Sequence, residues 1–145
     1  MSKDTFSTEE HQRILDAIHD AEKDTSGEIR LFVEKNCKED VLDRAAFIFG
    51  ELNMHKTDLR NGVLFYIATA SHRFAVLGDA GINSKVPPDF WDHIKDTMKK
   101  HFAAGDLVTG LSEGIRMGGK ALKEYFPYKS GDTNELSNEI AFGKD

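Results

Sequence analysis

The chain has 145 residues, a net charge of −6 at pH 7 and a hydrophobic fraction of 39%. This length suffices for one domain with its own core, and the composition excludes a disordered or fibrous protein. The basic residues are scattered rather than clustered, which argues against a nucleic-acid-binding face. The only cysteine, Cys37, excludes an intramolecular disulfide and is consistent with a cytoplasmic protein.

The sequence predicts no membrane anchor. The N-terminal residues are polar and lack the apolar segment of a signal peptide. The longest apolar run, residues 62–70, is less than half of the roughly 20 residues that a membrane-spanning helix requires. We therefore expect a cytoplasmic protein without an integral membrane segment.

The N-terminal part of the chain alternates helical and extended patterns. Ser7 and Glu10 form a capping-box pattern that opens an amphipathic helix over about residues 8–24. Residues 29–34 then alternate apolar and other side chains, which is typical of a strand. Asp40 can cap a second helix, so we expect a helical crossover between this strand and the next.

The middle of the chain predicts a polar loop followed by a hairpin. Residues 53–61 are polar, and residues 62–68 are apolar on both faces, as in a central strand covered on both sides. The short segment 69–72 favours a hairpin, after which residues 73–77 return antiparallel. The segment Gly78-Asp79-Ala80-Gly81 should end that strand.

The C-terminal part predicts two further helices and a tail. The pair Pro87-Pro88 suits a first helical turn, and Asp106 can cap a fourth helix that ends before Pro127. The tail 129–145 is polar, although residues 139–142 could add an edge strand. The order of elements predicts a three-layer αβα sandwich with a central mixed sheet of three to four strands. We assign the single domain to residues 1–128.

Acidic and amide side chains are expected to gather at one edge of this sheet. If strand 29–34 runs parallel to strand 62–68, the starts of both strands and the end of strand 73–77 lie together. The loops and the third helix at that edge supply the candidate metal ligands Asp79, Asp58, Glu28, Asp89, Asn61 and Asp92.

Several carboxylates in a small volume repel one another, so they either take up protons or bind a cation. Oxygen ligands on loops suit Ca²⁺, whereas Mg²⁺ requires stricter geometry and more water. Gly78 and Gly81 flank Asp79 and allow the backbone to turn tightly. No Cys/His spacing typical of zinc is present, so we predict a Ca²⁺ or Mg²⁺ site.

A structural interpretation of the same acids stays open. Asp58 can be a turn residue, Asp89 a helix N-terminal charge and Asp92 a solvated side chain. Asp79 is harder to explain in this way, because it directly follows a strand with a buried pattern. The alternative is therefore a structural domain with a solvated acidic rim.

Four short motifs, in this order and spacing, resemble the TPM domain family over about residues 6–126. They are Ser26-Gly27-Glu28-Ile29, Asn61-Gly62-Val63-Leu64-Phe65, Gly78-Asp79-Ala80-Gly81, and Phe102-Ala103-Ala104-Gly105-Asp106 followed by Gly110-Leu111. The resemblance implies an αβα sandwich and divalent-cation binding by the loops around Asn61 and Asp79. It also implies phosphatase activity in some plant members.

Two functions follow as hypotheses. The first is a metal-responsive binding or regulatory module for an unidentified protein partner, in which the ion orders the loops. The second is a metal-dependent phosphatase acting on phosphomonoesters, in which His55 or a carboxylate handles the proton. A phosphatase also needs a basic clamp for phosphate, for which Arg60 and Lys85 are the candidates, although Arg60 could instead pair with an acid.

Overall fold

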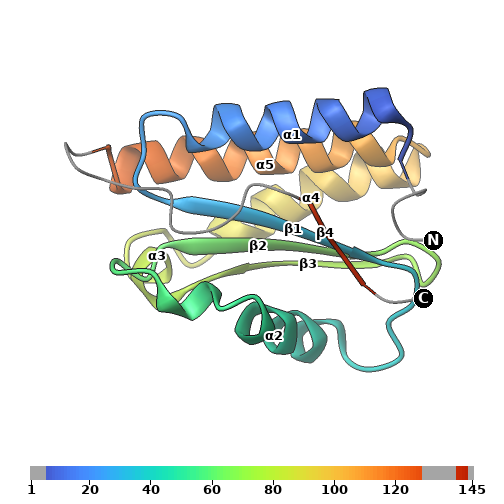
Figure 1. The fold of residues 1–145 in the computed structure, drawn as a ribbon, viewed down its shortest axis with the longest axis horizontal. Coiled ribbons are helices and arrows are strands. Elements are labelled where there is room, and N and C mark those ends of the chain that lie inside the picture. Colours follow the sequence, from blue (N-terminus) through green and yellow to red (C-terminus); the bar gives the residue numbers. More distant parts are fainter. Residues whose placement is uncertain (1–5, 129–139, 144–145) are drawn as a thin grey trace.

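The computed structural model describes residues 6–128 and 140–143. Its helices and strands form three layers, as the sequence predicted (Figure 1). The helices are α1 (Thr8–Glu22), α2 (Val41–Glu51), α3 (Ala80–Asn83), α4 (Phe90–Ala103) and α5 (Leu107–Tyr125), with a 3₁₀ helix at Met54–Lys56. The strands are β1 (Glu28–Glu34), β2 (Gly62–Ala68), β3 (Arg73–Gly78) and β4 (Ala141–Phe142).

The sheet is mixed and has the strand order β3-β2-β1-β4. Strand β1 pairs parallel with β2, and β3 returns antiparallel to β2, which confirms the predicted crossover and hairpin. Strand β4 pairs parallel with β1 at the other edge of the sheet. Of the expected edge segment 139–142, residue 139 lies outside the described residues, as does most of the predicted tail.

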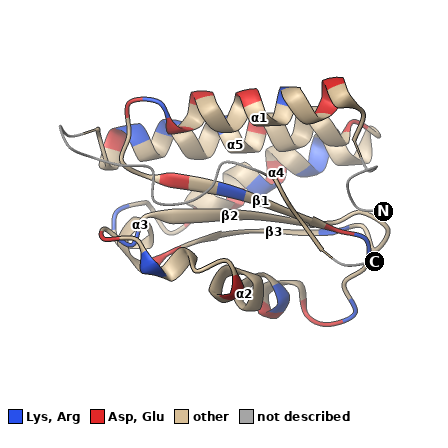
Figure 2. Cartoon of the chain, viewed as in Figure 1, with Lys and Arg blue, Asp and Glu red and all other residues tan. Residues whose placement is uncertain are grey.

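The two faces of the sheet carry separate apolar cores. Helices α1, α4 and α5 cover one face, and α2 covers the other (Figure 1). All seven residues of β2 are buried, as expected for a central strand between two helical layers. Charged residues lie along α1 and in the loops, whereas β2 carries none (Figure 2).

Helix starts follow the predicted capping chemistry. Ser7 and Glu10 form both bonds of a capping box, Glu10 N–H to Ser7 Oγ at 3.1 Å and Ser7 N–H to Glu10 Oε1 at 2.9 Å. Asp40 caps α2 and Asp106 caps α5 through their carboxylates. Within residues 6–128 and 140–143, no helix combines the length and apolar character that a bilayer crossing requires.

Three local details differ from the sequence prediction. The loop 53–61 is not purely polar, because its 3₁₀ helix places Met54 in the core at 0% exposure. Asp79 does not only end β3, because its side chain caps the short helix α3. Helix α4 begins at Phe90 rather than at the proline pair, whose residues lead into it through a turn.

Candidate functional site

The predicted convergence of strand ends is present. We define the loop edge as Glu28, the segment 57–61 and the segment 78–83. In the strand register Glu28 lies opposite Gly62, and the neighbouring residue Val63 lies opposite Gly78. The sequence therefore predicted correctly which segments meet at this end of the sheet.

Backbone hydrogen bonds join the segments of the loop edge. The Glu28 N–H donates to the Asn61 carbonyl at 3.4 Å, and the Asp79 N–H donates to the Gly62 carbonyl at 2.9 Å. The Gly81 N–H donates to the Arg60 carbonyl at 2.8 Å. A Cβ atom at Gly81 would lie only 2.6 Å from that same carbonyl oxygen, so glycine allows the two loops to approach this closely.

Asp79 forms a two-point ion pair with Arg60. Arg60 Nε donates to Asp79 Oδ2 at 2.7 Å, and one terminal nitrogen donates to Oδ1 at 2.8 Å. Asp79 Oδ1 also accepts the Ala80 N–H at 2.7 Å. The hydrogen bond and the charge of Asp79 raise the pKa of Arg60 above its ordinary value. The charge of Asp79 is therefore balanced by a guanidinium.

The two members of this pair differ in their surroundings. The Asp79 side chain is 6% exposed, whereas the Arg60 side chain is 51% exposed. Arg60 also has a φ of +52°, in the left-handed region that non-glycine residues seldom occupy. The carboxylate is thus fixed in the fold, while the guanidinium reaches it from a solvent-exposed turn.

Two buried side chains at the loop edge lack a hydrogen-bond partner within the described residues. They are Thr57, through Oγ1, and Asn61, through Nδ2. Both residues are almost inaccessible, at 4% and 1% exposure, and Glu28 beside them is 2% exposed. Because buried polar atoms are nearly always paired, a polar ligand at these atoms would complete their bonding. Thr57 was not among the predicted ligands, and only its place in the loop beside Asn61 could have suggested it.

The remaining predicted ligands lie at the surface. Asp89 and Asp92 have side chains that are 67% and 70% exposed, and they pair with His93 at 3.2 Å and Lys95 at 3.6 Å. Asp58 is exposed, as is the proposed proton-transfer residue, His55. Among residues 6–128 and 140–143, no group of three or more His, Cys, Asp and Glu side chains is arranged to hold a metal.

A second buried carboxylate lies at the opposite end of β1 and was not among the candidates. Glu34 accepts two hydrogen bonds from Arg44 at 2.8 and 2.9 Å and one from the Tyr66 hydroxyl. Burial acts most strongly on Glu34 and raises its pKa, but the bonds from Arg44 and Tyr66 and the Arg44 charge outweigh burial and leave the pKa lowered. Burial and then the bond to Glu34 raise the pKa of Tyr66.

The layers, the sheet order and the glycine-lined loop edge define a small αβα domain. The chain belongs to the TPM domain family, whose model matches residues 2–121. It is similar to the BA42 protein from the psychrophilic bacterium Bizionia argentinensis, whose NMR structure is 46% identical with a TM-score of 0.89, covering 96% of each chain. None of the curated proteins compared with the chain matches it.

Two more distant solved structures share the fold. The N-terminal domain of a protein from P. gingivalis has a TM-score of 0.70 at 17% identity, covering 86% of this chain and 82% of that one. The N-terminal domain of a protein from Corynebacterium glutamicum has a TM-score of 0.65 at 12% identity, covering 92% of this chain and 82% of that one. At these identities the likeness concerns the fold alone.

Proposed function

We propose that this TPM domain is a divalent-metal-responsive binding module whose ion is held at the loop edge. Asp79, Glu28 and Asn61 would provide the central ligands, with Asp58, Asp89 and Asp92 as the further acids of the same rim. The observation that carries the proposal is the pair of buried, unpartnered polar atoms on Thr57 and Asn61 beside two nearly inaccessible carboxylates.

The donor set favours a hard cation. Carboxylate, hydroxyl and amide oxygens are ligands for Ca²⁺ and Mg²⁺, and Ca²⁺ tolerates variable coordination numbers and distances. The unpartnered atom of Asn61 is Nδ2, and a half-turn of the carboxamide would bring its acceptor oxygen to the same position. The types of donor present therefore suit Ca²⁺, and Mg²⁺ is the second choice.

Arg60 would make the conformation of the proposed site depend on the metal ion. Both oxygens of the Asp79 carboxylate accept hydrogen bonds from Arg60, so an ion at Asp79 would compete with the guanidinium. Arg60 is half exposed and can return to water at little cost. Ion binding would thus exchange one counter-charge for another. The ion would hold the 57–61 and 78–83 segments together through its ligands and would free Arg60, and a protein partner could bind the changed surface.

The alternative, a phosphatase acting on phosphomonoesters, has less support. Its phosphate clamp was expected from Arg60 and Lys85. Arg60 is paired with Asp79 in the structure, and the Lys85 ammonium lies 5.6 Å from the centre of the Phe126 ring. A binding module, in contrast, does not require Arg60 or Lys85 beside the metal ion. Turnover of p-nitrophenyl phosphate that is metal-dependent and lost in Asp79→Asn would reverse this preference.

The proposal places the domain in the cytoplasm. Cys37 is the only cysteine of the chain and is a buried free thiol, which suits a reducing compartment. This part of the proposal is tested separately, by fractionating cells that produce the protein and detecting it with an antibody.

The test of the ion site is thermal unfolding of metal-stripped protein in EDTA, Mg²⁺ and Ca²⁺. Ion binding to the native state alone should add about 2.7 kcal/mol at a hundredfold excess over the dissociation constant. Asp79→Asn should abolish the gain, and the matched exposed variant Asp96→Asn should keep it. Arg60→Gly should raise the ion affinity, because it removes the competing guanidinium and suits the positive φ. An unfolding temperature that neither ion changes would refute the proposal.

A further inference from the structure

A pocket of about 400 Å³ lies at the far end of the β2–β3 hairpin, away from the loop edge. The hairpin residues 67–69 and 72–74 form one wall, and the end of α4 with the start of α5 forms the other. This volume falls in the lower part of the range of small-molecule pockets, which is roughly 300 to 1,000 Å³. The pocket shares no residue with the loop edge.

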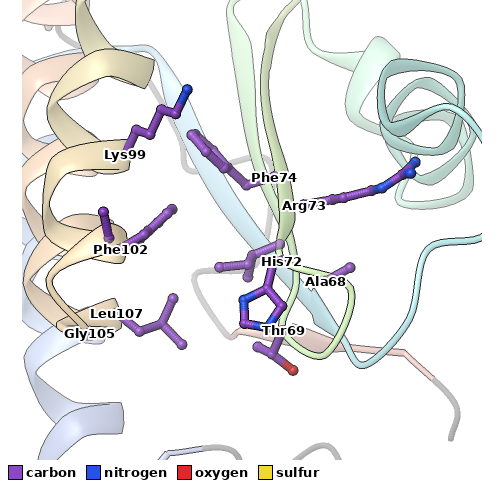
Figure 3. A pocket seen from close by; sticks show the side chains of 11 residues that line it. Ala68, Thr69, His72, Arg73, Phe74, Lys99, Phe102, Gly105 and Leu107 are labelled. Atoms are coloured by element: carbon purple, nitrogen blue, oxygen red, sulfur yellow. The ribbon is translucent and has the colours of Figure 1, made fainter.

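The inner walls of this hairpin pocket are apolar. Phe74, Phe102 and Leu107 point into the space between the hairpin and α4 (Figure 3). The rings of Phe74 and Phe102 meet edge to face, with their centres 4.9 Å apart. Phe102 can take this position because residue 110 is glycine: a Cβ atom there would lie 2.7 Å from Phe102 Cδ1. The walls thus suit an apolar ligand body.

Of the described residues that line the hairpin pocket, every ionisable one is basic, in a protein whose net charge is −6. They are His72, Arg73 and Lys99. Arg73 points away from the space and donates to the Glu39 carbonyl at 3.1 Å (Figure 3). Lys99 and His72 stay at the margins of the pocket, and neither side chain forms a hydrogen bond or ion pair with any residue in the described ranges.

We propose that the hairpin pocket binds a small organic acid, with a short aliphatic or aromatic body between Phe74, Phe102 and Leu107 and a carboxylate held by Lys99. The Lys99 ammonium is a mobile donor on a long stem and can follow the carboxylate to its position. His72, on the hairpin, supplies a further donor.

The charge of the lining selects this class of ligand. A neutral apolar molecule would gain nothing from Lys99, and a cationic one would be repelled by it. A carboxylate uses both features of the pocket, because its body leaves water while its charge stays at the solvent-exposed margin. This inference is independent of the proposed ion site, which lies at the opposite end of β2 and β3.

The test is an NMR titration of the ¹⁵N-labelled full chain with hexanoate, and with hexanol and hexylamine as neutral and cationic counterparts. Hexanoate should shift the amide signals of Thr69, Phe74 and Ala103, and should bind at least tenfold more tightly than hexanol. Hexylamine should bind most weakly. Equal affinity for hexanoate and hexanol, or shifts confined to other residues, would overturn the proposal.

Two lysines on α4 provide a matched pair of variants. Lys99→Gln should weaken hexanoate binding roughly tenfold, as expected for loss of one charged hydrogen bond, and should leave hexanol binding unchanged. Lys100→Gln removes the same charge from the next residue, which does not line the pocket, and should change the affinity less than twofold. Both residues are exposed, so both variants should fold. Equal losses in the two variants would show a general charge effect and overturn the assignment.

Discussion

The two ends of the sheet carry two carboxylate–arginine pairs of the same geometry in different settings. Asp79 with Arg60 and Glu34 with Arg44 both form two hydrogen bonds of 2.7 to 2.9 Å, and both carboxylates are 6–7% exposed. Arg44, however, lies on helix α2 and is 29% exposed, whereas Arg60 lies on a turn and is 51% exposed. Glu34 also has a third donor in Tyr66, which is 1% exposed.

The difference indicates that the partners of a buried carboxylate determine its role. The carboxylate can be a fixed part of the structure, or it can exchange its arginine for another cation. Removing Arg44 would leave the Glu34 carboxylate, which is 7% exposed, inside the fold without a counter-ion. Removing Arg60 from Asp79 would leave one carboxylate at an edge where Thr57 and Asn61 already have unpartnered atoms. We therefore expect the Glu34 end to determine stability and the Asp79 end to determine binding.

The largest expected effect is the loss of stability in Glu34→Ala. The variant leaves Arg44 partly buried and Tyr66 fully buried without their acceptor, and should cost about 3 kcal/mol, as other broken buried ion pairs do. Asp79→Ala should cost only about 1 kcal/mol, the typical cost of a lost N-cap, because Arg60 returns to water. Urea unfolding at pH 7 measures both.

A second variant shows whether the cost comes from the abandoned charge. In Glu34→Ala with Arg44→Met, the guanidinium is gone and an apolar side chain of similar length replaces it. Part of the lost stability should then return. If Asp79→Ala proves as costly as Glu34→Ala, the division between a structural and an exchangeable end is wrong.

The sequence predicted the loop edge well because topology alone determines it. A helical crossover makes strands 29–34 and 62–68 parallel, a short turn makes the next strand antiparallel, and these relations bring Glu28, Asn61 and Asp79 together. The sequence also suggested that Arg60 could pair with an acid, but it did not identify Asp79 as the partner. Side-chain choice among several nearby carboxylates depends on turn geometry, which the residue pattern does not specify.

The Glu34 network and the hairpin pocket could not be predicted in the same way. Glu34 stands at the end of β1, where a charged residue is equally consistent with a solvated position. Its burial depends on Arg44, one turn into α2, and on Tyr66 from the neighbouring strand. The pocket depends on how α4 packs against the edge strand β3, and helical spacing predicts only which side of α4 is apolar.

The next effect concerns the contact between the two loops of the Asp79 end. Gly81→Ala would place a Cβ atom against the backbone carbonyls of Leu59 and Arg60 and force the segments apart, at a cost of about 1 to 3 kcal/mol. If ion binding requires these loops to stay together, the variant should also lose its calcium-dependent gain in unfolding temperature.

The matched control is Gly50→Ala on helix α2, where a Cβ atom has nothing within 4 Å. That variant should stabilise the protein by about 0.4 to 1 kcal/mol, because alanine restricts the unfolded chain and favours the helix. Its response to calcium should be that of the unchanged protein. A Gly81→Ala variant with unchanged stability would mean that the 57–61 loop moves freely away from α3.

The smallest effect is the acid sensitivity contributed by Glu34. Its pKa in the folded protein is lowered below the ordinary value of 4.5. The stabilisation is therefore fully present above about pH 4.5 and is lost as the pH falls through the lower folded value. Glu34→Gln cannot ionise, so its stability deficit relative to the unchanged protein should shrink between pH 5 and pH 3. The change should be smaller than the cost of Glu34→Ala, because protonated Glu34 still fills the space that alanine would leave empty. Asp106, whose pKa is also lowered, is common to both proteins and cancels in the comparison. Urea unfolding at stepped pH values gives this difference, and a deficit that stayed constant to pH 3 would mean that the charge of Glu34 contributes nothing to the structural end of the sheet.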